Sequence, residues 1–175
     1  MIPGSFNHLW NHPEDCCRWL NEGTVVEGAH VSVVMRHPVI LVLDVEFRPP
    51  PSTFLPDFPA ERVRVSTTSS MEIVAVPEHG DRQWLHRYPR CWPSSNLPLL
   101  SLAGGLCMWY PRDPPHLQWA WIDGFDEYLR IVQRHLWNEE YWRRFDEWPI
   151  EDVPHGESLS GEPHPILDPS WRSPA

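Results

Sequence analysis

Proline is distributed unevenly along this chain, and its distribution limits where helices and strands can form. The sequence has 21 prolines among 175 residues, well above the usual share of about 5%. Proline is excluded from helix interiors and central strands because it lacks a backbone N–H and clashes with the preceding helical turn. Residues 48–60 hold five prolines and are expected to form a long loop. Residues 151–175 combine proline with few apolar side chains, so we expect a largely extended or flexible C-terminal tail.

The first segments between these proline clusters predict a helix and two strands. Pro13 can open a short helix that reaches about Asn21, because proline is well placed in a first helical turn. Residues 25–46 are rich in β-branched side chains and are interrupted by Arg36-His37-Pro38. This composition predicts two strands joined as a hairpin.

The later segments predict two more strands and then helices. Charged and apolar side chains alternate in residues 61–67 and again in 71–76, which is typical of half-buried antiparallel strands. Apolar residues then recur every three or four positions in residues 121–136, with Asp123 as the expected N-cap, and again in 137–148. We expect this aromatic stripe to pack in the core. The order predicts an α+β fold with an antiparallel sheet, as one domain over residues 1–150.

Charge and composition exclude several classes of function. The formal net charge is -10, and none of the 14 basic residues is a lysine. Phosphate backbones and anionic membrane surfaces require clustered basic side chains, so we expect no nucleic-acid or membrane partner. Mechanisms that need a P-loop or Schiff-base lysine are excluded as well. The sequence has neither a signal-peptide pattern nor a long apolar run, which predicts a cytoplasmic protein.

The four cysteines are expected to be free thiols. A chain of this size without a signal peptide is not a typical disulfide scaffold, and no CxxC pair indicates zinc. Of the vicinal pair Cys16-Cys17, we expect one buried and one exposed member. His8, His12 and Cys16 are spaced four residues apart, which would align metal ligands on one continuous helix, but Pro13 interrupts it. We therefore expect no metal or other cofactor.

The segment Gly104-Gly105-Leu106-Cys107 is the strongest candidate for chemistry. Glycines let backbone amides approach a reacting group, and the thiol of Cys107 lies beside them. The alternative is a small buried thiol, because free cysteine is among the most buried residue types. A cysteine hydrolase is a further alternative, in which His86 or His116 would act as a base oriented by a carboxylate.

At this segment the sequence resembles the ubiquitin-conjugating (UBC) enzyme family, specifically its bacterial relatives from antiphage signalling operons. The elements that match the family generally are Tyr88-Pro89, the irregular segment 92–102 and Gly104-Gly105-Leu106-Cys107. The elements similar to the bacterial branch are Trp109-Tyr110-Pro111-Arg112-Asp113-Pro114, the aromatic-rich stretch 135–143, Trp148-Pro149 and Pro154-His155-Gly156. The resemblance covers roughly residues 61–156.

The resemblance implies a UBC-like antiparallel β-meander of about four strands with flanking helices. It also implies that Cys107 carries the C-terminus of a protein as a thioester and passes it to a target amine. Family members have a His-Pro-Asn element whose Asn supports the oxyanion, and this chain lacks that element. Asn96, in Asn96-Leu97-Pro98, and His86 are the candidate substitutes. Asp113 is a candidate for orienting the amine, or else a turn residue before Pro114.

The partners implied by the resemblance are proteins. They are an activating enzyme, a target that supplies the amine, and a donor that supplies the C-terminal tail. In operons for cyclic-oligonucleotide antiphage signalling (CBASS), a cGAS-like nucleotidyltransferase is the expected donor.

A second function, from another class, fits the same sequence. A non-catalytic module could keep the UBC fold and use its Trp-rich helices to bind a protein partner, since exposed aromatic clusters favour interfaces. The missing His-Pro-Asn element supports this alternative.

Overall fold

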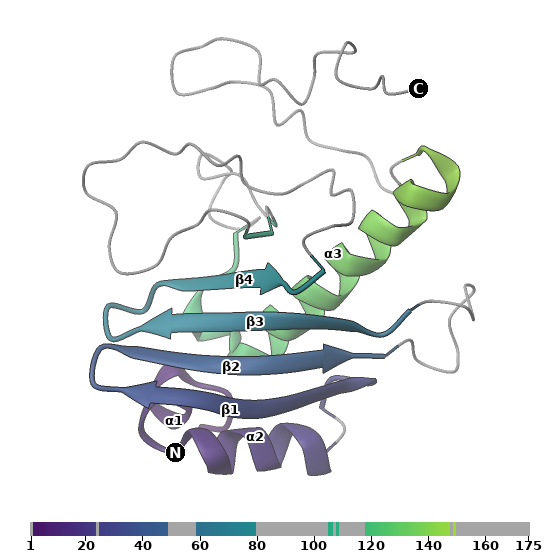
Figure 1. The fold of residues 1–175 in the computed structure, drawn as a ribbon. Coiled ribbons are helices and arrows are strands. Elements are labelled where there is room, and N and C mark those ends of the chain that lie inside the picture. The colour runs from purple at the N-terminus through teal and green to yellow at the C-terminus, as the bar shows by residue number, and fades with distance from the viewer. Residues whose placement is uncertain are drawn as a thin grey trace, which may run out of the picture.

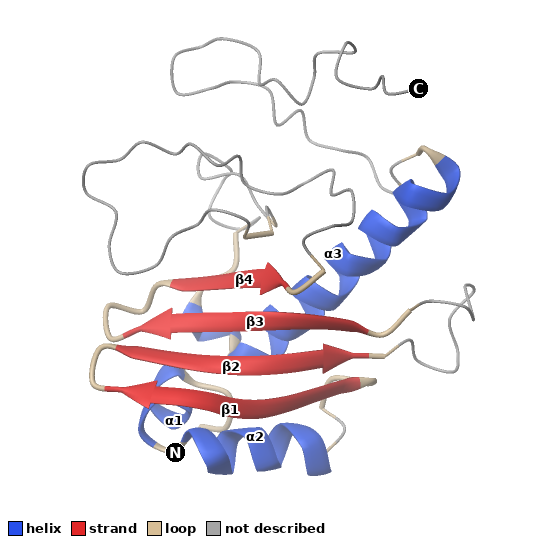
Figure 2. Cartoon of the chain, viewed as in Figure 1, coloured by secondary structure: helices blue, strands red, loops and turns tan. Residues whose placement is uncertain are grey.

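A computed structural model describes residues 2–23, 25–48, 59–79, 105–106, 108, 118–147 and 149. Two short helices, α1 (Phe6–Asn11) and α2 (Pro13–Glu22), precede four strands. The strands are β1 (Ala29–His37), β2 (Ile40–Phe47), β3 (Glu61–Thr68) and β4 (Ile73–Pro77). A 3-10 turn, η2 (Trp121–Asp123), then leads into the long helix α3 (Phe125–Phe145). Figure 1 shows the order of these elements, and Figure 2 shows the segregation of strands from helices.

The four strands form one antiparallel sheet in the order β1-β2-β3-β4. Every strand pairs with its neighbour in sequence, with a register shift between Val33 and Met35. This arrangement confirms the predicted α+β class and the four-stranded antiparallel sheet. The predicted break at Arg36-His37-Pro38 is corrected in part, because Arg36 and His37 belong to β1 and pair with β2. The strands are joined by a tight turn at Pro38-Val39, since proline cannot continue the ladder.

One face of the sheet is apolar and packs on the helices. Leu43, Val45, Val63 and Val65 are fully buried, and they share one core with Leu129 of α3. In Figure 1, α3 crosses behind the sheet while α2 lies along β1. The opposite face carries charged side chains at the alternate positions, as the period of two requires.

Two hydrogen bonds join α3 to backbone carbonyls in the N-terminal part of the chain. The Phe125 N–H donates to the Gly4 carbonyl at 2.7 Å, and Gln133 Nε2 donates to the Glu27 carbonyl at 2.6 Å. On α2, the Asn21 amide donates to the Val31 carbonyl and accepts from the Val31 N–H, both at 2.9 Å. Because this amide satisfies the outer backbone groups of an edge strand, it protects that point against further strand pairing.

The helices differ from the sequence prediction in three respects. A short helix, α1, precedes the predicted one, with Ser5 Oγ accepting from the His8 N–H at its start. The two predicted C-terminal stretches form one helix, α3. Its N-cap is Gly124 rather than Asp123, whose carboxylate instead accepts from the Ala120 N–H at 2.8 Å and closes η2.

The aromatic stripe was predicted correctly only in its first half. Phe125, Tyr128 and Leu136 are buried in the core. Beyond Leu136 the described aromatic side chains do not join the core, and Phe145 is 54% exposed. Among the described residues of α3 after Leu136, the buried side chain is a polar one, that of Glu139. The predicted C-terminal tail, residues 151–175, lies outside the described residues.

Candidate functional site

The four candidate catalytic residues, Cys107, Asn96, His86 and Asp113, lie outside the described residues. The same holds for His116. Gly105, Leu106 and Met108 are described, however, so the structure brackets Cys107 on both sides.

The segment just before Cys107 is joined to the outer edge of the sheet. The Leu106 N–H donates to the Ala75 carbonyl of β4 at 2.8 Å. Leu106 is buried, and both it and Ala75 belong to the hydrophobic core, against which Met108 packs. β4 pairs with β3 along its length, and a site on such a regular element is positioned more accurately than one on a free loop. Leu106, which directly precedes Cys107, is therefore held in a fixed position beside β4.

A carboxylate–histidine pair lies at the end of the same strand. The Glu61 carboxylate is 7% exposed and lies 2.7 Å from Nδ1 of His79, which is 46% exposed. The register aligns them, because Val63 pairs with Pro77 and the Glu78 N–H donates to the Arg62 carbonyl. A carboxylate at Nδ1 fixes the ring orientation of a histidine. His79 lies four positions after Ala75, which corresponds to about 13 Å of extended chain.

Sequence analysis missed this pair, although one signal was available. Glu61 falls in phase with Val63 and Val65, which are the buried positions of β3. A carboxylate in a buried position requires a partner, so the alternation itself predicts one.

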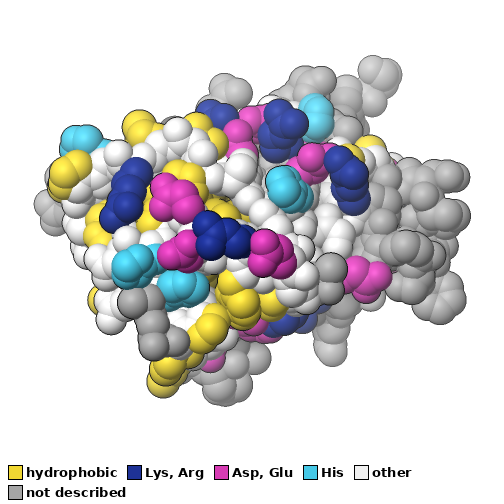
Figure 3. All heavy atoms as spheres, turned by 90° about the horizontal axis from the view of Figure 1, so that it is seen from below, with side chains coloured by type: hydrophobic (Ala, Val, Ile, Leu, Met, Phe, Trp, Pro, Cys, Tyr) yellow, Lys and Arg dark blue, Asp and Glu magenta, His cyan; other side chains and the backbone are white. Residues whose placement is uncertain are grey.

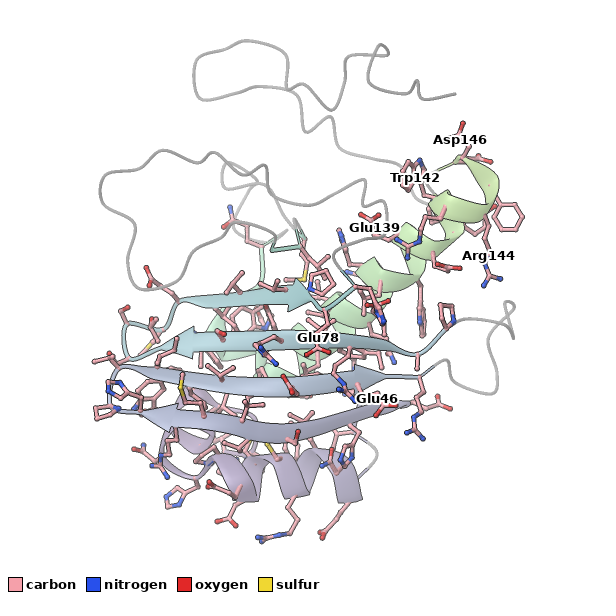
Figure 4. All side chains as sticks on the ribbon, viewed as in Figure 1. Glu46, Glu78, Glu139, Trp142, Arg144 and Asp146 are labelled. Atoms are coloured by element: carbon pink, nitrogen blue, oxygen red, sulfur yellow. The ribbon has the colours of Figure 1, made fainter. Side chains whose placement is uncertain are left out.

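The C-terminal half of α3 carries a partly buried ionic cluster. Glu139 is fully buried, with Oε1 3.5 Å from His135 Nε2 and Oε2 4.0 Å from Arg143 Nη1. Burial opposes ionisation of the neighbouring Glu140, but hydrogen bonds from Arg144 and Arg143 outweigh it and hold the pKa of Glu140 below its ordinary value. Figure 4 labels Glu139 and Arg144 along this part of the helix. These ion pairs orient the charged side chains of α3 in the part of the helix where the apolar stripe ends.

The outer face of the sheet carries a second charged network. Arg64 lies 3.1 Å from Asp44 and 3.1 Å from Glu78, and Arg62 lies 3.8 Å from Glu78. Glu46 and Glu78 are labelled on this face in Figure 4. Because these pairs are partly exposed, we assign them little stabilisation.

Cys16 and Cys17 are both buried, which corrects the expectation that one of them is exposed. Burial raises the pKa of Cys16 to about 11 and that of Cys17 to about 12. His12 is exposed and separates α1 from α2, so His8, His12 and Cys16 do not lie along one helix. Within the part of the chain that the structure describes, no three metal-binding side chains come together.

These two thiols should resist alkylation in the folded protein. The thiolate is the reactive form, and a raised pKa leaves very little of it at neutral pH. We expect iodoacetamide at pH 7.5 to modify neither Cys16 nor Cys17 in native protein, and to modify both in denaturant. Peptide mass spectrometry distinguishes these thiols from Cys91 and Cys107. Fast modification of Cys16 or Cys17 without denaturant would contradict the described packing.

Two strand turns and η2 form an apolar area, here called the turn-end surface, that includes Val39, Met71 and Ile122. Val39 is 37%, Met71 52% and Ile122 94% exposed. The two turns and η2 are neighbours, because the Ser69 N–H donates to the Val39 carbonyl at 3.2 Å and Trp121 Nε1 donates to the Met71 carbonyl at 2.7 Å. Exposed apolar side chains gathered in this way are typical of protein interfaces.

Comparison with models of protein families, with curated proteins and with solved structures found no match. Among the described residues, no helix is both long and apolar enough to cross a membrane.

Proposed function

We propose that this chain is a UBC-like protein that carries the C-terminus of another protein as a thioester on Cys107 and transfers it to an amine of a target. The observation that carries the proposal is the hydrogen bond from Leu106 to Ala75, which ties the segment before Cys107 to the edge of the sheet. The order of elements also supports it. Helices lead into a sequential four-stranded meander, the cysteine segment follows, and a long helix comes after it, as in the UBC fold.

The proposed reaction needs no cofactor. The Cys107 thiolate attacks the carbonyl carbon of a thioester held by an activating enzyme, and the thiolate of that enzyme leaves. A target amine then attacks the new thioester, an amide bond forms, the Cys107 thiolate leaves, and a base takes the proton of the amine. The backbone amides of Gly104 and Gly105 and the side chain of Asn96 are the proposed oxyanion donors. His86 and Asp113 are the proposed polar groups near the amine.

The proposed setting is bacterial antiphage defence of the CBASS type. The donor is then a cGAS-like nucleotidyltransferase or another protein with a C-terminal tail. This part of the proposal depends on the resemblance in residues 61–156.

Serine at position 107 tests the chemistry. A Cys107→Ser variant would carry an oxygen ester, which survives a thiol reductant, whereas the wild-type thioester would not. Each protein is expressed with the products of its neighbouring genes and separated on gels with and without reductant. We expect a reductant-labile adduct for the wild type and a resistant one for Cys107→Ser. Cys91→Ser is the matched control and should behave like the wild type; loss of the adduct in that variant alone would assign the chemistry to Cys91.

The turn-end surface supports the second candidate function, a non-catalytic binding module. In that case, Ile122→Asp should abolish co-purification of a neighbouring gene product, and Cys107→Ala should leave it intact. Reactivity of Cys107 distinguishes the two functions. Rapid alkylation of the Cys107 thiol in native protein favours the transferase, and slow alkylation favours the binding module.

A further inference from the structure

A pocket of about 370 Å³ lies between the C-terminal end of α1 and the β1–β2 turn. It is lined by Trp10, Arg36, His37, Pro38 and Leu41. Leu41 is a buried core residue, whereas Arg36, His37 and Pro38 are exposed. The pocket therefore joins an apolar inner part to a polar opening.

Arg36 is held in place and still has donors to offer. Its Nη2 donates to the carbonyls of Trp10 at 3.5 Å and Asn11 at 3.1 Å, which are carbonyls at the end of α1. A guanidinium has five N–H donors and no acceptor, so the donors on Nε and Nη1 remain for a ligand. Because the two carbonyls orient the group in advance, less conformational entropy is lost when a ligand binds.

The other polar side chains of the pocket are donors too. Nδ1 of His37 accepts from the Val39 N–H at 3.4 Å, so the neutral ring carries its proton on Nε2. Trp10 has an indole N–H, which is a donor only. None of the described lining side chains is acidic. A complementary ligand must therefore supply acceptors.

The local charge also favours an anion. Asp and Glu are absent from residues 3–13 and from residues 28–43, although the whole chain has a net charge of -10. The nearest carboxylates along the chain are Glu14, Asp15 and Asp44, of which Asp15 pairs with Arg18. In the view from below in Figure 3, His, Arg and hydrophobic side chains lie at the left end of the molecule, with Asp and Glu side chains beside them.

We propose that this pocket binds a carboxylate carried on an apolar group, such as the C-terminal residue of a peptide. The carboxylate would accept from Arg36 and His37, and the apolar side chain would contact Trp10, Pro38 and Leu41. A bidentate contact to arginine suits a planar carboxylate. One permanent cation matches its single negative charge better than the nearly double charge of a phosphate monoester.

The test is a titration of the full-length protein, labelled with ¹⁵N, with N-acetyl-L-leucine. N-acetyl-L-leucinamide is the matched neutral probe, and phenyl phosphate is the matched phosphate. We expect saturable shifts of the Trp10 indole and of the Arg36 and His37 amides, with a millimolar dissociation constant for so small a ligand. The neutral amide should bind about tenfold more weakly or worse, because it lacks the charge-assisted hydrogen bonds.

Variants locate the site. Arg36→Gln should weaken binding of N-acetyl-L-leucine at least about tenfold. Because Arg36 also caps α1, His37→Phe serves as a second variant that leaves the contacts of Arg36 with α1 in place. It removes the Nε2 donor, together with the acceptor for the Val39 N–H, and should weaken binding by a smaller factor. Arg62→Gln, on the outer face of the sheet and outside the pocket lining, is the control and should bind like the wild type. Equal binding of acid and amide, tighter binding of phenyl phosphate, or shifts that do not saturate would each overturn the proposal.

Discussion

Replacing Phe125 with alanine should destabilise the protein by about 3–5 kcal/mol, because the substitution leaves a cavity in a close-packed core. Phe125 is fully buried, and its ring stacks with those of Trp121 at 6.4 Å and Tyr128 at 6.1 Å. Its position also brings the start of α3 to the Gly4 carbonyl. The loss would be a large fraction of the stability of a typical domain.

Urea unfolding followed by circular dichroism measures this effect. In a thermal scan, the midpoint should fall by roughly 10 °C. Ile122→Ala is the matched control, since Ile122 is an apolar residue three positions away that is 94% exposed. Its free energy of unfolding should change by less than about 0.5 kcal/mol. Equal effects of the two substitutions would contradict the described core.

Gly28→Ala should lower the free energy of unfolding nearly as much as Phe125→Ala does, because of the backbone conformation at this position. Gly28 has a φ of +76°, and a Cβ placed there would lie 2.2 Å from the Arg48 carbonyl oxygen. The Arg48 N–H donates to the Gly28 carbonyl at 2.7 Å, so this contact closes the end of the β1–β2 ladder. Strain at positive φ and the clash together should cost about 2–5 kcal/mol.

The control for this prediction is the preceding residue. The Glu27 side chain is exposed, and only its carbonyl is engaged, by Gln133. Glu27→Ala should therefore leave the urea midpoint nearly unchanged. If Gly28→Ala unfolds at the wild-type midpoint, the positive φ and the close approach to Arg48 are not features of the folded protein.

The sheet could be predicted because its signals are local. β-branched residues mark β1 and β2, the alternation of charged and apolar residues marks β3, and Pro38 marks the turn. Pro13 marks the start of α2 in the same way. The N-terminus of α3 was misplaced because Asp123 is a good cap by type, yet Gly124 at φ 92° begins the helix. Cap choice there depends on η2, which has no clear sequence signal.

The candidate site was less predictable, because it depends on contacts between distant residues. The glycines before Cys107 indicate a close approach of backbone amides, but the hydrogen bond from Leu106 to Ala75 joins segments 31 residues apart. The pairing of Glu61 with His79 likewise requires the β3–β4 register. Helical periodicity predicted a core role for residues 137–148, but periodicity alone does not show where the sheet stops covering the helix.

The most direct test of thioester carriage on Cys107 is intact-mass spectrometry of the protein expressed with its neighbouring genes. Wild type and Cys107→Ala are compared before and after reduction, with circular dichroism to show that both are folded. The proposed function predicts a wild-type adduct of the mass of a second protein less one water, lost on reduction, mapped to Cys107 and missing from the variant. A folded wild-type protein that carries no such adduct with the gene products present, or an adduct that persists in Cys107→Ala, would contradict it.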